Sequence, residues 1–238
     1  MLEVENLSAG YGELRILFDI NASLESGKIT TIAGPNGSGK STLLKAIFGL
    51  ATIHSGRVLY RGRDITYLQP HVKTRMGIAY LPQVDNIFID LTVEENLRMA
   101  GYILEEGEYI ERRNLALEIF PDLKDRLKQN ARTLSGGERQ FLALATALIR
   151  RADLLMLDEP SAMLSPKFAS TIFNKILELK EKFGLTILIV EQNIKKALEI
   201  SDNAYVLING RVVFQGTSKQ LLEHEKFERF CIGAKVFD

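Results

Sequence analysis

The sequence predicts an α/β fold in which a mostly parallel sheet carries helices on both faces. Five short apolar runs are bounded by turn residues, which is typical of strands buried on both faces. Segments of helical periodicity separate these runs, and strands that alternate with helices usually pair in parallel. The expected strands are residues 29–33, 78–81, 154–157, 185–190 and 204–208, and the expected helices are residues 40–50, 93–102, 110–120, 137–150, 166–183 and 193–200.

Two parts of the chain depart from this alternation. Residues 2–7, 16–24 and 57–65 combine alternating hydrophobicity with glycine turns, which predicts an antiparallel β subdomain. Residues 92–136 are almost entirely helical in pattern and rich in charge, so we expect a helical subdomain set into one domain that spans residues 1–238. The tail from Glu223 to Asp238 carries Phe227, Phe230 and Phe237, and predicts a packed terminal helix rather than a partner surface.

Composition excludes several classes of protein. With 238 residues, 46% of them hydrophobic, the chain can bury a substantial core. Thirty basic residues balance thirty acidic ones, so no overall field recruits nucleic acid. The single cysteine, Cys231, excludes an internal disulfide. No apolar run is long enough to span a membrane, and the N-terminus is acidic where a signal peptide would be basic, so we expect a cytoplasmic location.

The stretch G-P-N-G-S-G-K-S-T, from Gly34 to Thr42, follows an expected strand and opens an expected helix. It fits the phosphate-loop pattern G-x-x-x-x-G-K-[ST] in the context that this pattern requires. Backbone N–H groups and the helix N-terminus would cradle a β-phosphate, Lys40 would bridge the β- and γ-phosphates, and Ser41 would offer a hydroxyl to Mg²⁺. The alternative is a glycine turn without a ligand. The predicted nucleotide-binding residues here are Asn36, Gly37, Ser38, Gly39, Lys40, Ser41 and Thr42.

A second acidic site follows the apolar run L-L-M-L, where Asp158 and Glu159 precede Pro160. Asp158 is placed to hold Mg²⁺, and Glu159 to polarise a water molecule that attacks the γ-phosphate. An isolated Asp-Glu pair is otherwise often a solvated loop. Behind a phosphate loop, the pair predicts a P-loop ATPase that uses ATP and Mg²⁺.

The stretch L-S-G-G-E-R-Q, from Leu134 to Gln140, can be explained as a capped helix start. Between the phosphate loop and Asp158-Glu159, however, it resembles the signature of ABC-type ATPases, and the resemblance covers nearly the whole chain. It implies that Ser135, Gly136 and Gly137 of one chain close over the nucleotide of a second chain, so that hydrolysis needs a dimer. It also implies that Tyr11 stacks on adenine and that Gln83 joins Mg²⁺ to the contact with the membrane subunit.

The family normally carries a histidine near the γ-phosphate after the late strand, and the stretch I-V-E-Q-N puts Gln192 at that position. A glutamine donates a hydrogen bond but carries no positive charge. Many relatives also have an aspartate at the position of Ser165, so weaker catalysis, or catalysis that depends on a partner, is expected. These departures resemble the smaller ATPase subunit of branched-chain amino-acid importers, although that subunit typically has glutamate at the position of Gln83.

The resemblance implies an energy-coupling subunit on the inner face of the cell membrane, bound to transmembrane permease subunits through a surface that includes Ala131 and Arg132. It would pair with a second ABC ATPase chain, or with itself when alone. Exporters and lipid-extraction systems remain alternatives. Relatives in DNA repair would carry a long coiled coil and relatives in translation two domains, and neither pattern is present. Glu159 argues against a sensor that binds ATP without splitting it.

Overall fold

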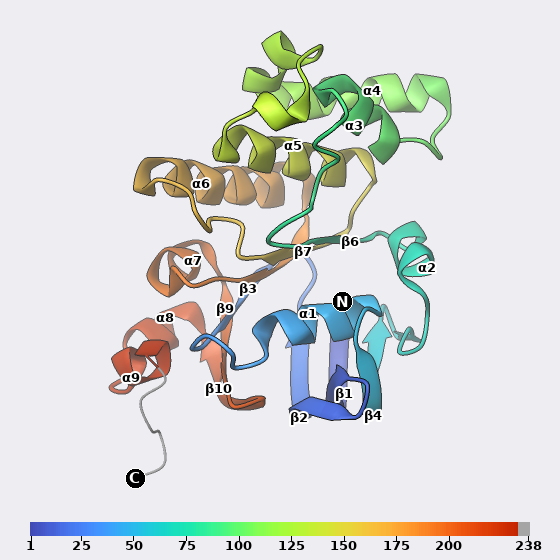
Figure 1. The fold of residues 1–238 in the computed structure, drawn as a ribbon. Helices are drawn as coiled ribbons and strands as arrows, with labels where there is room; N and C mark the ends of the chain where they lie inside the picture. Colours follow the sequence, from blue (N-terminus) through green and yellow to red (C-terminus); the bar gives the residue numbers. More distant parts are fainter. Residues whose placement is uncertain (233–238) are drawn as a thin grey trace.

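The computed structural model describes residues 1–232. Its larger sheet has six strands in the order β10-β9-β3-β8-β7-β6 (Figure 1). These are β10 (Arg211–Thr217), β9 (Asn203–Ile208), β3 (Ile29–Ala33), β8 (Thr186–Val190), β7 (Leu154–Asp158) and β6 (Ile78–Leu81). Every neighbouring pair from β9 to β6 is parallel, and β10 pairs with β9 in the antiparallel sense. The predicted parallel sheet is therefore confirmed, with β10 as an edge strand that the sequence did not predict.

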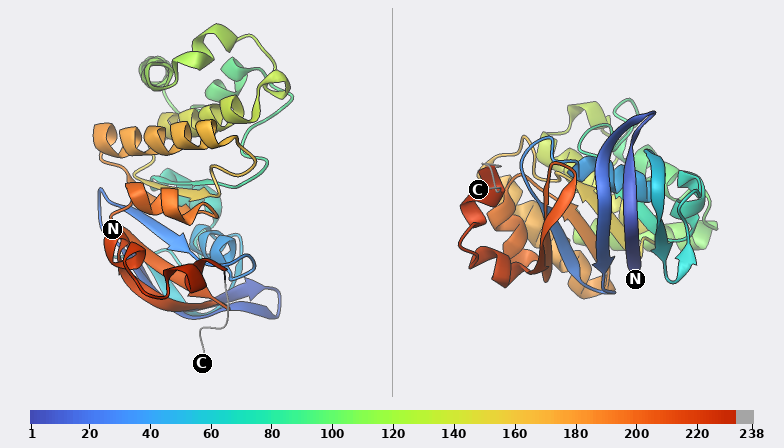
Figure 2. Two further views of the ribbon diagram at one scale, coloured as in Figure 1. Left: turned by 90° about the vertical axis from the view of Figure 1, so that its left-hand side faces the viewer. Right: turned by 90° about the horizontal axis from the view of Figure 1, so that it is seen from below.

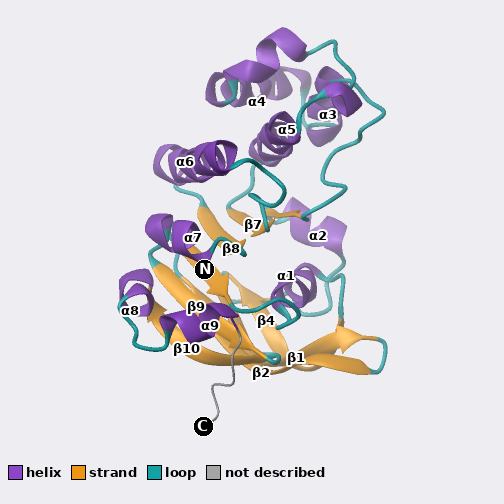
Figure 3. Cartoon of the chain, turned by 60° about the vertical axis from the view of Figure 1, so that its left-hand side comes forward, coloured by secondary structure: helices purple, strands orange, loops and turns teal. Residues whose placement is uncertain are grey.

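The central strands are buried on both faces, which explains their unbroken apolar runs. Along β7, Leu155 and Leu157 face a core formed with α5 (Gly136–Ile149) and α6 (Pro166–Phe183). Leu154 and Met156 face the opposite core, which contains α1 (Lys40–Phe48) and part of the second sheet. The views in Figures 1 and 3 agree that α1 lies between the two sheets. Helices therefore cover both faces, as predicted.

The second sheet is antiparallel, with the order β2-β1-β4-β5, and is seen from below in Figure 2. Its strands are β2 (Leu14–Leu24), β1 (Leu2–Tyr11), β4 (Thr52–Tyr60) and β5 (Arg63–Asp64). The antiparallel prediction is confirmed, and a glycine turn of the expected kind lies within residues 57–65. In this turn, Arg61 and Gly62 both adopt positive φ, 52° and 75°.

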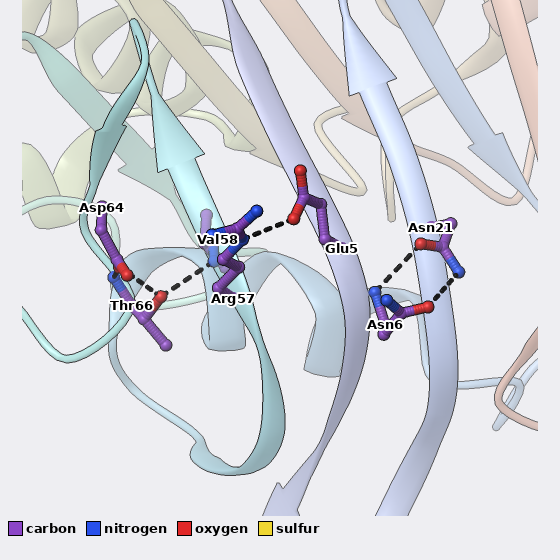
Figure 4. Close-up of polar contacts among 7 residues, drawn as sticks. All are labelled: Glu5, Asn6, Asn21, Arg57, Val58, Asp64 and Thr66. Carbon is purple, nitrogen blue, oxygen red and sulfur yellow. Dashed lines mark hydrogen bonds and ion pairs between the residues drawn. The ribbon is translucent and has the colours of Figure 1, made fainter.

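Polar contacts tie the strands of this sheet together (Figure 4). Asn21 donates from Nδ2 to Oδ1 of Asn6 across β1 and β2. Arg57 on β4 pairs with Glu5 on β1. Thr66 accepts a hydrogen bond from the backbone N–H of Val58, so the segment after β5 is fixed to β4.

A set of helices lies beyond α5, on the side away from the large sheet (Figures 1 and 2). It comprises α3 (Val93–Ala100), α4 (Glu106–Ile119) and two short 3₁₀ helices, η1 (Pro121–Arg126) and η2 (Ala131–Thr133). Helix α3 begins with a capping box in which Thr92 accepts from the N–H of Glu95 and the Glu95 carboxylate accepts from Thr92. These helices occupy the segment for which a helical subdomain is predicted.

Four helices complete the described chain: α2 (Pro70–Arg75), α7 (Ile194–Ile200), α8 (Ser218–Leu222) and α9 (Phe227–Ile232). In α9, Phe230 is buried and lies 6.2 Å, between ring centroids, from Phe214 on β10. The predicted packed helix is present to that extent, and Phe237 lies outside the described residues. None of the helices described within residues 1–232 is both long and apolar enough to cross a bilayer.

Candidate nucleotide site

The phosphate loop runs from the carboxyl end of β3 into the first turn of α1. Gly34 must be glycine, because a Cβ there would lie 2.1 Å from the carbonyl oxygen of Leu207, and its φ is 144°. Gly39 precedes α1 with φ 101°. No described side chain caps the start of α1, and its first turn carries no acidic residue. The N–H groups of that turn are therefore available to an anion.

Lys40 places its ammonium group at the mouth of this loop. Its Nζ donates to the carbonyl oxygens of Gly34 and Pro35, each at 2.8 Å. Burial lowers the pKa of Lys40, while the nearby carboxylates of Glu159 and Asp158 oppose that shift. The loop thus holds a desolvated cation, which favours binding of a phosphate group.

Asp158, at the end of β7, contacts the phosphate loop directly. Ser41 donates from Oγ to Oδ1 of Asp158 at 2.7 Å, and Asp158 is 5% exposed. Tyr80 on β6 donates its hydroxyl to Oδ2 at 3.1 Å. Burial, followed by the charge of Asp158, raises the pKa of Tyr80, so the phenol keeps the proton that it donates. Two hard oxygen donors, those of Ser41 and Asp158, are held side by side, and this arrangement fits Mg²⁺.

Glu159 follows Asp158 in the chain, and its carboxylate accepts hydrogen bonds from two side-chain amides. Gln192, after β8, donates from Nε2 to Oε2 of Glu159 at 2.8 Å, and Gln83, after β6, donates to the same oxygen at 3.0 Å. The Glu159 backbone has a φ of 50° and its N–H donates to the carbonyl of Val190 at 2.8 Å. Three segments that are far apart in the sequence therefore meet at one carboxylate.

A cavity of about 330 Å³ joins these groups. The lining comprises phosphate-loop residues, one residue of β2, and Glu159 with its two amide donors: Ile16, Asn36, Gly37, Gly39, Lys40, Ser41, Thr42, Gln83, Glu159 and Gln192. The cavity thus brings phosphate-loop residues and an ammonium group together with a carboxylate and two amides. The arrangement fits a phosphate chain with a carboxylate near its end. Ser38 lies inside the loop, 2% exposed, and its hydroxyl has no hydrogen-bond partner among residues 1–232.

Tyr11 lies apart from this cavity, at the end of β1, with 42% of its surface exposed. The Nζ atom of Lys45, on α1, lies 6.0 Å from the centre of its ring. The aromatic face is therefore on the side of the phosphate-loop helix, but Tyr11 does not line the 330 Å³ cavity. The structure does not bring it together with the phosphate site residues.

Ser135, Gly136 and Gly137 stand at the start of α5 and line none of the cavities around Glu159. Ser135 caps the helix by accepting from the N–H of Glu138 at 3.3 Å, and both Ser135 and Gly136 are exposed. Gly137 is buried against the ring of Phe168, which a Cβ at this position would meet at 2.1 Å. Within one chain, the signature is thus a capped and partly exposed helix start.

One prediction made beside the signature needs revision, and the weaker catalysis expected from Ser165 stays a prediction. Ala131 is completely buried, so it cannot contact a partner, while Arg132 is exposed and pairs with Asp90. Ser165 is the N-cap of α6 and accepts from the N–H of Phe168 at 3.4 Å. Serine and aspartate are both favourable N-cap residues, so either of them can begin α6 at this position.

Sequence reasoning missed Tyr80 and Glu191. Each lies at the end of a strand that the sequence does predict, but their contacts depend on which strands are neighbours. Tyr80 reaches Asp158 because β6 pairs with β7. Glu191 is 1% exposed and accepts hydrogen bonds from two different loops. The one available signal was a charged residue directly after a fully apolar strand.

Comparisons with known proteins agree with this geometry. A family model described as ABC transporter matches residues 17–162. The chain is 60% identical over 233 residues to the probable branched-chain amino acid transport ATP-binding protein LivF of Archaeoglobus fulgidus, covering 98% of this chain and 99% of that protein.

Solved structures give the same result. The ADP conformation of MJ1267, an ATP-binding cassette of an ABC transporter, superposes with a TM-score of 0.86 at 32% identity, covering 97% of each chain. A dimeric post-hydrolysis state of the cassette MJ0796, bound to ADP and Pi, has a TM-score of 0.81 at 25% identity and covers 92% of this chain and 99% of that one. The chain therefore belongs to the ATP-binding proteins of the ABC transporter family.

Proposed function

We propose that this chain hydrolyses ATP to ADP and phosphate as the energy-coupling subunit of a membrane importer for branched-chain amino acids. The observation that carries the proposal is the placement of Glu159 in the lining of the same cavity as Lys40 and the phosphate loop. A carboxylate at that position polarises a water molecule toward the terminal phosphate. The import role and the cargo are supported by the 60% identity to LivF.

Each site residue has a role in this proposal. The N–H groups of Asn36 to Thr42 and the ammonium of Lys40 bind the phosphates. Ser41 and Asp158 would hold Mg²⁺, with Gln83 close to it, and the ion would supply charge that neutralises the phosphate oxygens. Glu159 is the general base, Gln192 donates a hydrogen bond beside it, and Tyr11 stacks on adenine. Ser135, Gly136 and Gly137 act on the nucleotide of a second chain.

A dimer is part of the proposal because the signature lies away from its own chain's phosphate site. The exposed position of Ser135 and Gly136 leaves these residues open to a partner chain. The family includes cassettes solved as dimers. We infer that the working form is a pair, with a second ABC ATPase chain or with another copy of this chain.

A groove beside α2 supplies the surface for a permease subunit. It encloses about 520 Å³ between α2 and the end of α3. Tyr102 and Ile103 line it and are 72% and 56% exposed. Arg75 and Arg150 add positive charge at the same groove. An apolar groove with a cationic lining suits an amphipathic cytoplasmic segment of a membrane subunit. Such binding would place the chain on the inner face of the membrane.

The hydrolysis is tested by measuring phosphate release from ATP by the purified chain, with Mg²⁺ and with a chelator. Turnover that requires Mg²⁺ and disappears in Lys40→Ala supports the proposal, and phosphate release that Lys40→Ala leaves unchanged contradicts it. The import role is tested by co-expression with the permease subunits of a branched-chain amino-acid importer, followed by measurement of labelled leucine uptake into vesicles loaded with ATP. A complex that assembles and splits ATP without leucine uptake would identify another kind of ABC system.

A further inference from the structure

Glu191 is a carboxylate buried in the floor of the site. It follows β8 directly and is 1% exposed. None of the ion pairs formed within residues 1–232 includes it. Burial raises the pKa of Glu191, and hydrogen bonds from Ser161, Asn193 and Gln192 act in the opposite direction. A carboxylate without a cation is costly to bury, so its hydrogen bonds must account for its place in the fold.

The two carboxylate oxygens of Glu191 serve two different loops. Oε1 accepts from the backbone N–H of Ser161 at 2.7 Å, in the loop that follows β7. Oε2 accepts from the N–H groups of Gln192 at 3.0 Å and Asn193 at 3.3 Å, in the loop that follows β8. One side chain thus fixes both loops to the same point.

The segment after β7 carries Glu159 and the segment after β8 carries Gln192, and these two side chains contact each other. Ser161 lies two residues after Glu159, and Gln192 is the residue whose amide donates to Glu159 at 2.8 Å. The positive φ of Glu159, 50°, is unusual for a residue with a side chain and needs its flanking segment to be held. The Ser161 hydrogen bond supplies one such restraint. Glu191 therefore contacts both of the segments that carry the base and the amide.

We propose that Glu191 is a positioning residue that sets the geometry of Glu159 against Gln192, an inference that rests on the proposed ATP hydrolysis. Glu191 does not line the 330 Å³ cavity, and in the neighbouring cavity that Glu159 and Gln192 also line it is almost completely buried. It acts on turnover through the two loops and leaves the phosphate-binding groups of Lys40 and Ser41 unaffected. Only a carboxylate presents acceptors to both loops at once.

The variant Glu191→Gln distinguishes a positioning role of the carboxylate from a role in packing alone. A glutamine keeps size and shape, but its single oxygen accepts from one loop while its NH₂ group opposes the N–H groups of the other. We expect kcat to fall about tenfold or more, with KM for ATP changed less than about twofold. Glu191→Asp keeps two acceptor oxygens on a shorter stem and should retain more activity than Glu191→Gln.

Two further variants complete the design. Glu199→Gln is the matched control, because Glu199 lies on the neighbouring α7 and is exposed. It should leave kcat unchanged. In a Gln192→Ala background, Glu191→Gln should lower kcat by a smaller factor than in the parental chain, since part of its effect passes through Gln192. Circular dichroism and ATP titration on each variant monitor folding and nucleotide affinity.

The outcomes separate the inference from the function on which it rests. If the parental chain splits ATP and Glu159→Gln does not, the proposed function holds, and an unchanged kcat in Glu191→Gln then overturns the positioning role. A Glu191→Gln protein that loses ATP affinity and folding in proportion to kcat, with no recovery in Glu191→Asp, also overturns it. If the parental chain splits no ATP under any condition, both proposals fail together.

Discussion

Gln192 donates a hydrogen bond from Nε2 to Oε2 of Glu159 at 2.8 Å, and Gln83 donates to the same oxygen at 3.0 Å. Both donors are neutral amides, and they fix the orientation of the carboxylate without placing a positive charge beside it. Oε1 of Glu159 has no hydrogen-bond partner within the described chain, which leaves one oxygen for water. The amide at position 192 thus orients the proposed base, a role that needs no positive charge.

The amide at Gln192 predicts how pairing with a second ATPase chain changes the rate of ATP hydrolysis. A neutral amide that donates to a carboxylate or phosphate oxygen lacks the positive charge that a protonated histidine would add at this position. The composite site built on this chain should therefore be the slower one when it pairs with a second ATPase chain that carries histidine. The measurement compares phosphate release by each chain alone and by the mixture, and repeats it with Gln192→His. A lack of gain both on mixing and on introducing histidine would remove the case for unequal sites.

The proposed stacking of adenine on Tyr11 predicts a nucleotide contact without base selectivity. Stacking needs only a ring face, and it contributes about 1 kcal/mol. Tyr11→Ala should therefore weaken ATP and GTP binding by similar factors, on the order of fivefold each. Fluorescence titration of both nucleotides measures this. Tyr67→Ala is the control, because Tyr67 is 75% exposed and lies outside the 330 Å³ cavity. Equal affinities of Tyr11→Ala and the parental chain would assign the ring to sheet packing alone.

The close approach of Gly137 to Phe168 predicts a stability effect at the signature. A methyl group at 137 would lie 2.1 Å from ring carbons of Phe168. Gly137→Ala should lower the free energy of unfolding by about 1–3 kcal/mol. Gly107→Ala is the contrast, since a Cβ there meets nothing within 4 Å and Gly107 lies in α4. It should raise stability by up to about 1 kcal/mol. Urea unfolding distinguishes the two, and a neutral Gly137→Ala would show that Phe168 can move aside.

The buried Lys73 predicts that the free energy of unfolding increases as the pH rises into the alkaline range. Its side chain is 0% exposed and donates from Nζ to the carbonyl of Ile47 at 2.7 Å. Burial lowers the pKa of Lys73 to about 8, against the attraction of Asp64. Between pH 8 and the unfolded-state value of about 10.4, the unfolded chain binds more protons than the folded one, so unfolding becomes more costly as pH rises.

The contribution of Lys73 over that interval should be on the order of 1–3 kcal/mol. Lys73→Met removes the titrating group, so the difference in unfolding free energy between the parental chain and this variant should change with pH from 7 to 10. Urea unfolding at each pH measures it. A difference that stays constant across this range would mean that Lys73 has an ordinary pKa in the folded protein.

The sequence predicts those parts of the fold and site that depend on local pattern. The phosphate loop, the strand that ends in Asp158 and the helix capped by Ser135 are each defined by neighbouring residues. Contacts between strands could not be predicted in this way, because the local sequence of a strand does not determine which strands lie next to it in the sheet. The hydrogen bonds from Tyr80 to Asp158 and from Ser161 to Glu191 follow from β6 pairing with β7 and β7 with β8.

Strand β10 was missed for a related reason. It is an edge strand with little burial, and its sequence lacks the apolar run that identifies β7 or β8. For this strand, pairing with a neighbouring strand, rather than local sequence, determines the structure.

The central claim is that Glu159 prepares water while Lys40 and Ser41 bind phosphate, and the variant Glu159→Gln tests it most directly. Glutamine keeps the shape and the hydrogen bonds but removes the base. We predict that Glu159→Gln binds ATP with parental affinity and accumulates as an ATP-bound dimer on size-exclusion chromatography. Its rate of phosphate release should fall about 100-fold or more. Phosphate release at the parental rate would contradict the assignment of Glu159 as the base.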